Sequence, residues 1–159
     1  TIATKLSKLK GLTLLHNHLT HDFLHSIIEN RNESFWSSLE KIRLIILEQL
    51  MKNDQDTIMT YTTNTSPNNS FPKKIIKLAK KHECEIQFIH LTCKSETLLK
   101  RCTQASRKRF KKPQNPQTLK KEIENKDVFS TFDFVKSNTI NTEELSASEA
   151  ARKIAQTIR

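Results

Sequence analysis

The sequence predicts a three-layer α/β fold in which helices cover both faces of a parallel sheet. Segments whose apolar residues recur every three or four positions, as in helices, alternate with short apolar and β-branched runs, as in strands. Helices that join parallel strands by right-handed crossovers cover the faces of the sheet. The length of 159 residues suits one domain with its own core, so we expect a single domain over residues 1–159.

The elements follow one another in a clear order. We expect helix 1–10, strand 12–15, helix 16–30, helix 34–52, strand 56–63, loop 64–70, a helix from 70, strand 84–93, a helix from 95, strand 138–142 and a helix from 146. Gly11 is placed to end the first helix. Ser95 is placed to cap the helix that it begins, and Ser146 with Glu149 forms a capping box for the last helix.

Apolar stripes predict which helix faces are buried. Leu19, Phe23 and Ile27 share one face of the helix over residues 16–30. The helix over 34–52 has the strongest stripe, and Trp36 lies at helical spacing within it; the stripe consists of Phe35, Leu39, Ile42, Ile46 and Leu50. We therefore expect Trp36 to be a core residue.

Charge and composition narrow the possible functions. The net charge is +10, and residues 100–126 alone contribute +8, with ten Lys or Arg against two Glu, which favours an anionic partner at this segment. The three cysteines lack the spacing of a disulfide framework or a thiolate zinc site. No run is apolar enough to span a membrane and no signal peptide is apparent, so we expect a cytoplasmic protein without a membrane partner.

The predicted strands end in polar residues, which could form the rim of a pocket. His16, Asn17 and His18 follow the 12–15 strand, and Asn141 closes the 138–142 strand. Ligands of open parallel sheets bind beyond the carboxyl ends of the strands, so these positions are binding candidates.

Four stretches resemble the P-loop kinase-like proteins, including AAA-type ATPases and the shikimate-kinase-like and chloramphenicol-phosphotransferase-like enzymes. They are LLHNHLTHD, FWSSLEKIRLIILEQL, FIHLTCKSETLLKRC with SRKR shortly after it, and INTEELSASEAARKI. The resemblance implies a P-loop kinase-like fold and transfer of the ATP γ-phosphate to a small hydroxyl-bearing acceptor, with Mg²⁺. In that family a first strand and a G-x-x-x-x-G-K-[ST] loop precede the first helix. The helix over residues 1–10 resembles the one that follows this loop, and the 159 residues contain no such loop. We expect an N-terminally incomplete domain that is inactive as it stands.

The same resemblance implies roles for individual residues. His16, Asn17 and His18 would bind the acceptor, and Asp22 is the nearby acidic candidate for a general base. Residues 100–126 would form a lid in which Arg101 and Arg107 stabilise the transferring phosphoryl group. Thr1, Arg109 and Asn141 would contact ATP.

Other interpretations of these residues remain open. His18, His21 and His25 share a helical face and could bind a metal ion, although we expect none because Asp22 points away from that face. The histidines could equally be the polar surface of a helix, and the basic residues a solvated helix. Residues 100–126 could instead bind nucleic acid without catalysis, although Phe110 is the only aromatic residue there for base stacking.

Overall fold

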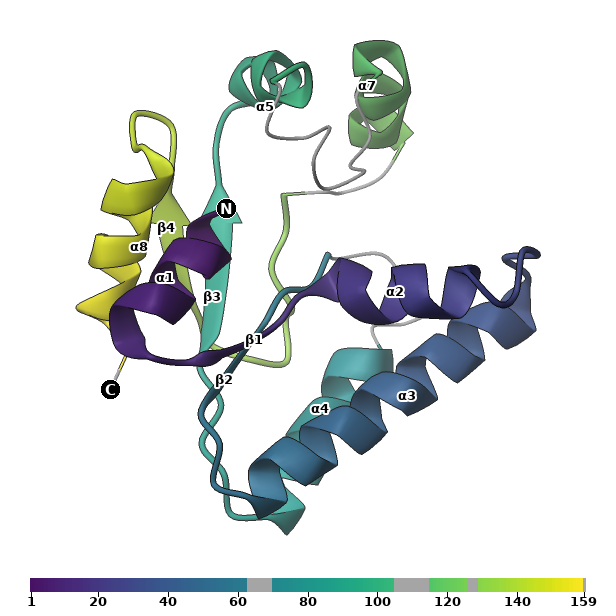
Figure 1. Ribbon diagram of the computed structural model, residues 1–159. Coiled ribbons are helices and arrows are strands. Elements are labelled where there is room, and N and C mark those ends of the chain that lie inside the picture. The colour runs from purple at the N-terminus through teal and green to yellow at the C-terminus, as the bar shows by residue number, and fades with distance from the viewer. Residues whose placement is uncertain (63–69, 105–114, 126–128, 159) are drawn as a thin grey trace.

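A computed structural model describes residues 1–62, 70–104, 115–125 and 129–158 (Figure 1). The predicted helices and strands occur in the predicted order, and the structure adds one helix that was not predicted, α7. The described elements are α1 (Ile2–Lys10), β1 (Thr13–Leu15), α2 (Asn17–His25), α3 (Glu33–Lys52), β2 (Thr57–Met59), α4 (Ser70–Lys81), β3 (Phe88–Thr92), α5 (Ser95–Cys102), α7 (Pro116–Asn125), β4 (Ser137–Asn141) and α8 (Ala147–Ala155). Most of the loop expected over 64–70 lies outside the described residues. No helix in the described part of the chain has the length and apolarity needed to cross a bilayer.

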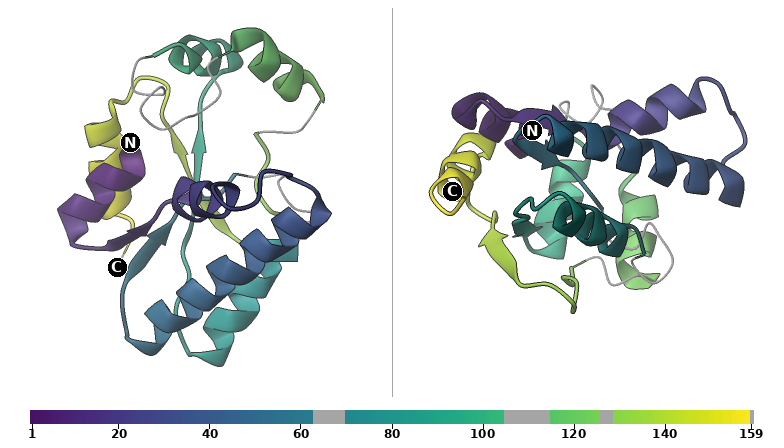
Figure 2. Two further views of the ribbon diagram at one scale, coloured as in Figure 1. Left: turned by 45° about the vertical axis from the view of Figure 1, so that its right-hand side comes forward. Right: turned by 90° about the horizontal axis from the view of Figure 1, so that it is seen from below.

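The strands pair in parallel, as predicted, in two ladders of two strands. β1 pairs with β2, and β3 pairs with β4. Among the described residues, no strand ladder joins β2 to β3. The helices lie on opposite flanks of the strands, with α1 and α8 side by side on one flank and α2, α3 and α4 on the other (Figures 1 and 2).

Local sequence explains where the helices begin and end. Gly11 ends α1 in the left-handed conformation, with a φ of 70°, which glycine adopts without strain. The predicted capping box at α8 is present. α2 ends at His25 and is therefore shorter than predicted. The backbone N–H of its C-cap residue, Ser26, bonds to the Asp22 carbonyl.

The cap of α5 differs from the prediction. The N-cap residue is Lys94, Ser95 is the first helical residue, and Lys94 makes no side-chain cap. Glu143, which follows β4, instead bonds to the start of the helix from a distant part of the sequence: its carboxylate accepts the Lys94 backbone N–H at 2.7 Å and the Thr97 hydroxyl. The start of α5 is therefore tied to the β4–α8 loop.

Two apolar clusters hold the helices to the strands. Leu6 of α1, Ile140 of β4, and Ala151 and Ile154 of α8 form the first. Leu24 of α2 packs with Phe35 and Leu39 of α3 in the second. The second cluster forms the base from which the pocket side chains project.

Two expectations about buried residues were wrong. Leu19, Phe23 and Ile27 are exposed, because α2 turns Thr20 and Leu24 toward α3 instead. Trp36 is not a core residue: 42% of its surface is exposed. Phe35 and Leu39 of the predicted stripe are each 1% exposed, so α3 buries the expected face and Trp36 lies at its edge, about 100° around the helix from Phe35.

Candidate functional site

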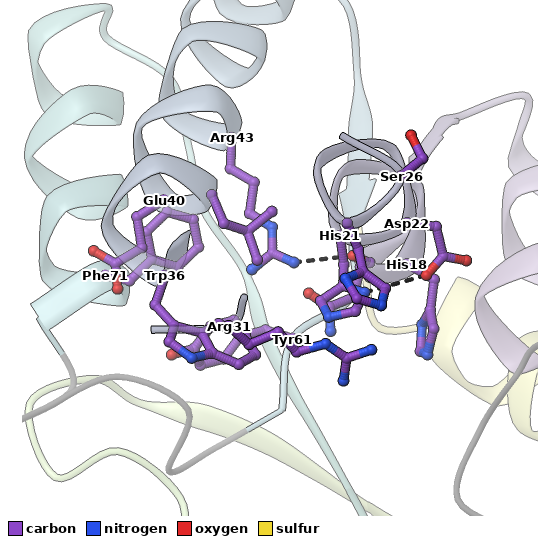
Figure 3. A pocket seen from close by; sticks show the side chains of 13 residues that line it. His18, His21, Asp22, Ser26, Arg31, Trp36, Glu40, Arg43, Tyr61 and Phe71 are labelled. Carbon is purple, nitrogen blue, oxygen red and sulfur yellow. Dashed lines mark hydrogen bonds and ion pairs between the residues drawn. The ribbon is translucent and has the colours of Figure 1, made fainter. Parts of the chain in front are cut away.

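A cavity of about 610 Å³ lies between α2, α3 and the segment that follows β2 (Figure 3). Its wall combines imidazole, guanidinium, carboxylate and aromatic groups. The lining residues are Asn17, His18, His21, Asp22, His25, Ser26, Arg31, Trp36, Leu39, Glu40, Arg43, Tyr61 and Phe71. The cavity is thus next to the carboxyl ends of β1 and β2, where parallel sheets bind ligands.

The start of α2 is fixed by bonds to its own cap and to the residue that follows β2. The Nδ1 atom of His16 accepts the His18 backbone N–H at 3.2 Å, and His16 is the N-cap. The Asn17 backbone N–H donates to Thr60 Oγ1 at 2.9 Å. These bonds place Asn17 and His18 at the cavity wall, whereas His16 lies beside it.

The histidines of α2 form a row of rings. Ring centroids are 6.5 Å apart for His18 and His21, and 5.9 Å apart for His21 and His25. His21 Nδ1 lies 3.2 Å from Asp22 Oδ1, so Asp22 is occupied by a neighbour on its own helix. In the described ranges, no group of three or more His, Cys, Asp or Glu side chains could hold a metal ion.

Arg43 is a buried cation in the cavity wall, with 6% of its surface exposed. Its Nε donates to Thr20 Oγ1 and its Nη2 donates to the Asn17 carbonyl oxygen, each at 2.9 Å. Its guanidinium carbon lies 6.0 Å from the centre of the Phe71 ring. Burial lowers the pKa of Arg43, and the nearby Tyr61 and Glu40 oppose this change.

Glu40, the acidic residue of α3 in the cavity wall, forms its ion pair with Lys74 and not with Arg43. Its Oε2 lies 2.9 Å from Lys74 Nζ on α4. Within the described ranges, Arg43 forms no ion pair with N–O separation of 4.0 Å or less. The hydrogen bonds of the guanidinium to described residues go to neutral oxygens.

Aromatic rings form the other part of the wall. The Trp36 ring lies 5.3 Å from Phe35 and 5.9 Å from His21, measured between centroids. Tyr61 lies 5.7 Å from Phe71. Figure 3 shows the Arg43 side chain with Trp36 on one side and His18 and His21 on the other.

The structure places only some of the predicted site residues in the cavity wall. Asn17, His18 and Asp22 line the cavity. Arg101 instead donates to Thr142 Oγ1 at 3.0 Å, and to the carbonyl oxygens of Thr142 and Glu143 at 2.6 and 3.1 Å. Arg101 therefore clamps the β4–α8 loop to α5.

The predicted ATP-contacting residues are only partly described. Asn141 Oδ1 accepts the Glu143 backbone N–H at 2.9 Å, and Thr1 caps α1 by accepting the Thr4 backbone N–H at 3.3 Å. Arg107 and Arg109 lie outside the described residues. The basic segment around them is described only at its ends, where α5 and α7 lie side by side (Figures 1 and 2).

Sequence reasoning missed Arg43, Trp36, Tyr61 and Phe71 as pocket residues. Arg43 left a signal, because it stands four residues after Leu39 and four before Leu47, on the buried face of α3. A cation in that position is rarely fully buried without a partner. The aromatic residues left no comparable signal, because their spacing also fits a core.

Comparison with solved structures agrees with the fold class, an α/β protein with parallel strands and kinase-like neighbours. The chain superposes on the "putative kinase" of Chloroflexus aurantiacus with a TM-score of 0.66 and 11% identity, covering 99% of this chain and 90% of that one. It superposes on the tunicamycin resistance protein of Deinococcus radiodurans with a TM-score of 0.60 and 14% identity, covering 98% of this chain and 88% of that one. No protein-family model and no curated protein matches the sequence.

Proposed function

We propose that the chain is the acceptor-binding part of a small-molecule kinase that transfers the ATP γ-phosphate to a hydroxyl group. One observation carries this proposal: a cavity lined with polar residues lies at the carboxyl ends of β1 and β2 in a fold shared with kinase-like proteins. Because fold likeness alone does not establish function, the argument depends on the cavity.

In this proposal each candidate residue has a defined task. Asn17 and His18 bind the acceptor in the cavity, and His16 supports them by capping α2. Asp22, hydrogen-bonded to His21, is the candidate general base. In a product that also contains the phosphate-binding loop, Arg101 and Arg107 would stabilise charge on the transferred group, and Arg109, Thr1 and Asn141 would contact ATP.

The residues present do not fit the triphosphate of ATP or its Mg²⁺ ion. A phosphate-binding loop needs several closely spaced glycines and a lysine, whereas Gly11 is the only glycine in the 159 residues and it ends α1. We therefore propose that this chain by itself is inactive. Activity would require a product that also contains the loop, in the cytoplasm, where ATP is plentiful and thiols such as Cys84 and Cys93 stay reduced.

The test is an ATP-dependent phosphorylation assay of the gene's entire translated product with hydroxyl-bearing acceptors. We expect Arg107→Ala to lower turnover more than it weakens acceptor affinity, because a lid arginine acts on the transition state. Lys108→Ala is the matched control, because Lys108 is an adjacent cation that has an ammonium group in place of a guanidinium. It should change turnover little. Loss of acceptor affinity with unchanged turnover in Arg107→Ala would contradict the lid role.

The charge of +8 over residues 100–126 supports a second candidate, a non-catalytic module that binds nucleic acid. A filter-binding titration at several salt concentrations separates the two functions. Nucleic-acid binding requires log affinity to fall linearly with log salt, with a slope near the number of phosphates contacted. Negligible binding at moderate salt would exclude this candidate.

A further inference from the structure

Arg43 lacks a counter-ion among the described residues, although it is almost completely buried. Two of its N–H groups are satisfied by Thr20 Oγ1 and the Asn17 carbonyl oxygen. A guanidinium carries five N–H donors, and burial of a charge is costly unless the charge is paired. Since Arg43 lines the cavity, an anionic ligand there could supply the missing partner.

A second buried group in the same corner is incomplete. Asn17 Oδ1 is buried and has no hydrogen-bond partner among the described residues. It belongs to the residue whose backbone carbonyl accepts from Arg43, so the unused donors and the unused acceptor belong to two side chains that meet at the Asn17 end of the cavity. A ligand that fits this corner therefore needs an anionic group and also a hydrogen-bond donor such as a hydroxyl.

The rest of the wall favours a ring. Trp36, Tyr61 and Phe71 all line the cavity, and aromatic faces pack well against a flat apolar ligand. The formal charges in the wall limit the charge of the ligand. The guanidiniums of Arg31 and Arg43 and the carboxylates of Asp22 and Glu40 all line the cavity. A singly charged carboxylate suits this balance better than a doubly charged phosphate, which the two carboxylates would repel.

We propose that the cavity binds a small hydroxylated aromatic carboxylic acid. The carboxylate bonds to Arg43, the hydroxyl donates to Asn17 Oδ1, and the ring lies against Trp36 and Tyr61. This inference rests on the proposed function in one respect, because it takes the cavity to be the acceptor site and names the class of acceptor.

Trp36 is the only tryptophan in the chain, so its fluorescence reports binding directly, without ATP. The intact 159-residue chain is titrated with para-hydroxybenzoate and with para-hydroxybenzamide, which has a similar shape but no charge. We expect the acid to bind about 10- to 100-fold more tightly, the range that one charge-assisted hydrogen bond supplies. Benzoate, which lacks the hydroxyl, should bind more weakly than para-hydroxybenzoate because Asn17 Oδ1 is left unpaired.

Two variants test the assignment to Arg43. Arg43→Gln should remove the preference for the acid over the amide. Thr20→Val disturbs the same hydrogen-bond network but keeps the charge, and it should retain the preference. If both variants unfold, the comparison of ligands on the unmodified chain still decides the question.

Equal affinity for acid and amide, tighter binding of the amide, or no fluorescence change with either ligand at millimolar concentration would overturn the inference. A different outcome would contradict the proposed function but not this inference. The chain would bind para-hydroxybenzoate more tightly than the amide, but the gene's entire product would phosphorylate no hydroxyl acceptor. Conversely, a product that phosphorylates only uncharged acceptors would support the kinase and contradict this inference.

Discussion

Glu48 on α3 joins its helix to α4 through a cluster of cationic partners. Its Oε1 lies 2.9 Å from Lys81 Nζ, 3.1 Å from His82 Nε2 and 3.6 Å from Lys52 Nζ. Hydrogen bonds from Lys81 and His82 lower the pKa of Glu48 from 4.5 to about 2. A carboxyl whose pKa is depressed by folding stabilises the folded state above its unfolded pKa, and this contribution is lost as pH falls toward the folded pKa.

We expect Glu48→Gln to lower the midpoint of thermal unfolding at pH 7 by a small amount. The difference from the unmodified chain should shrink between pH 4.5 and about 2, because Glu48 becomes protonated over that range. Circular dichroism melting curves across this range measure it. Glu29→Gln is the control, since it removes the same charge from an exposed residue. A difference that persists unchanged at pH 2 would show that the ion pairs contribute nothing.

Single residues were the hardest feature to predict from sequence. Phe35 and Trp36 are adjacent on a helix and therefore point about 100° apart, so they do not share one narrow buried face. Phe35 is buried with the rest of its predicted stripe, whereas Trp36 lies at the edge of that face and lines the cavity. Arg43 was missed for a related reason: its bonds to Thr20 and Asn17 depend on how α2 packs against α3, which local sequence does not specify.

At the scale of elements, α2 shows that periodicity predicts a helix better than it predicts the buried face. Leu19 and Phe23 are four residues apart, and so are Thr20 and Leu24, so the helix carries two candidate faces. The more apolar face is exposed, and the face with Leu24 packs on Phe35 and Leu39. The contact with α3 decided the orientation, and this contact is not encoded within α2.

The same substitution at two positions of α2 tests this orientation. We expect Leu24→Ala to destabilise the fold by about 2–5 kcal/mol, the usual range for a buried leucine, because Leu24 is 6% exposed. Leu19→Ala is the matched control: Leu19 is 60% exposed, so its effect should stay within about 0.5 kcal/mol. Urea unfolding curves of the two variants give the comparison. Equal losses at both positions would mean that α2 is rotated from the orientation described here.

The start of α8 offers a second prediction at this scale, where sequence and structure agree. Ser146 Oγ accepts the Glu149 backbone N–H at 3.2 Å, and Glu149 Oε2 accepts the Ser146 backbone N–H at 2.8 Å. We expect Ser146→Ala to cost about 1 kcal/mol of folding free energy, the usual value for an N-cap. Ser148→Ala, inside the helix, should be neutral or slightly stabilising, because alanine is the better helix former. Chemical denaturation measures both, and equal effects would contradict the capping role.

Caps of this kind are local, which is why the end of α1 and the start of α8 could be predicted. The capping box of α8 and the glycine at the end of α1 involve residues at most a few positions apart. The start of α5 could not be predicted in the same way, because Glu143 reaches it from 49 residues away. The features of this fold that sequence could not predict are those that depend on contacts between distant segments.

At the scale of the whole molecule, the described strands form two parallel ladders rather than one continuous sheet. β2 and β3 still contribute to one core, since Ile58 and Ile89 both pack on the cluster of α1, β4 and α8. An unpaired strand edge presents unused backbone N–H and C=O groups, which a further strand could satisfy. A product with an additional strand paired to both ladders should therefore be more stable than the 159-residue chain.

The last prediction concerns ATP and this 159-residue chain. Phosphate binding in P-loop proteins uses several backbone N–H groups, a helix N-terminus and a lysine that converge on the same oxygens. Each charge-assisted contact is worth roughly 1.5–3 kcal/mol, so the lack of three or four of them should weaken ATP binding about a thousandfold or more, at about 1.4 kcal/mol per decade. We expect no ATP hydrolysis and no magnesium-dependent binding by calorimetry, even if Arg107 and Arg109 are placed as proposed. Micromolar, magnesium-dependent binding of ATP to this chain would show that its phosphate contacts come from other residues, and that α1 is not the helix that follows a phosphate-binding loop.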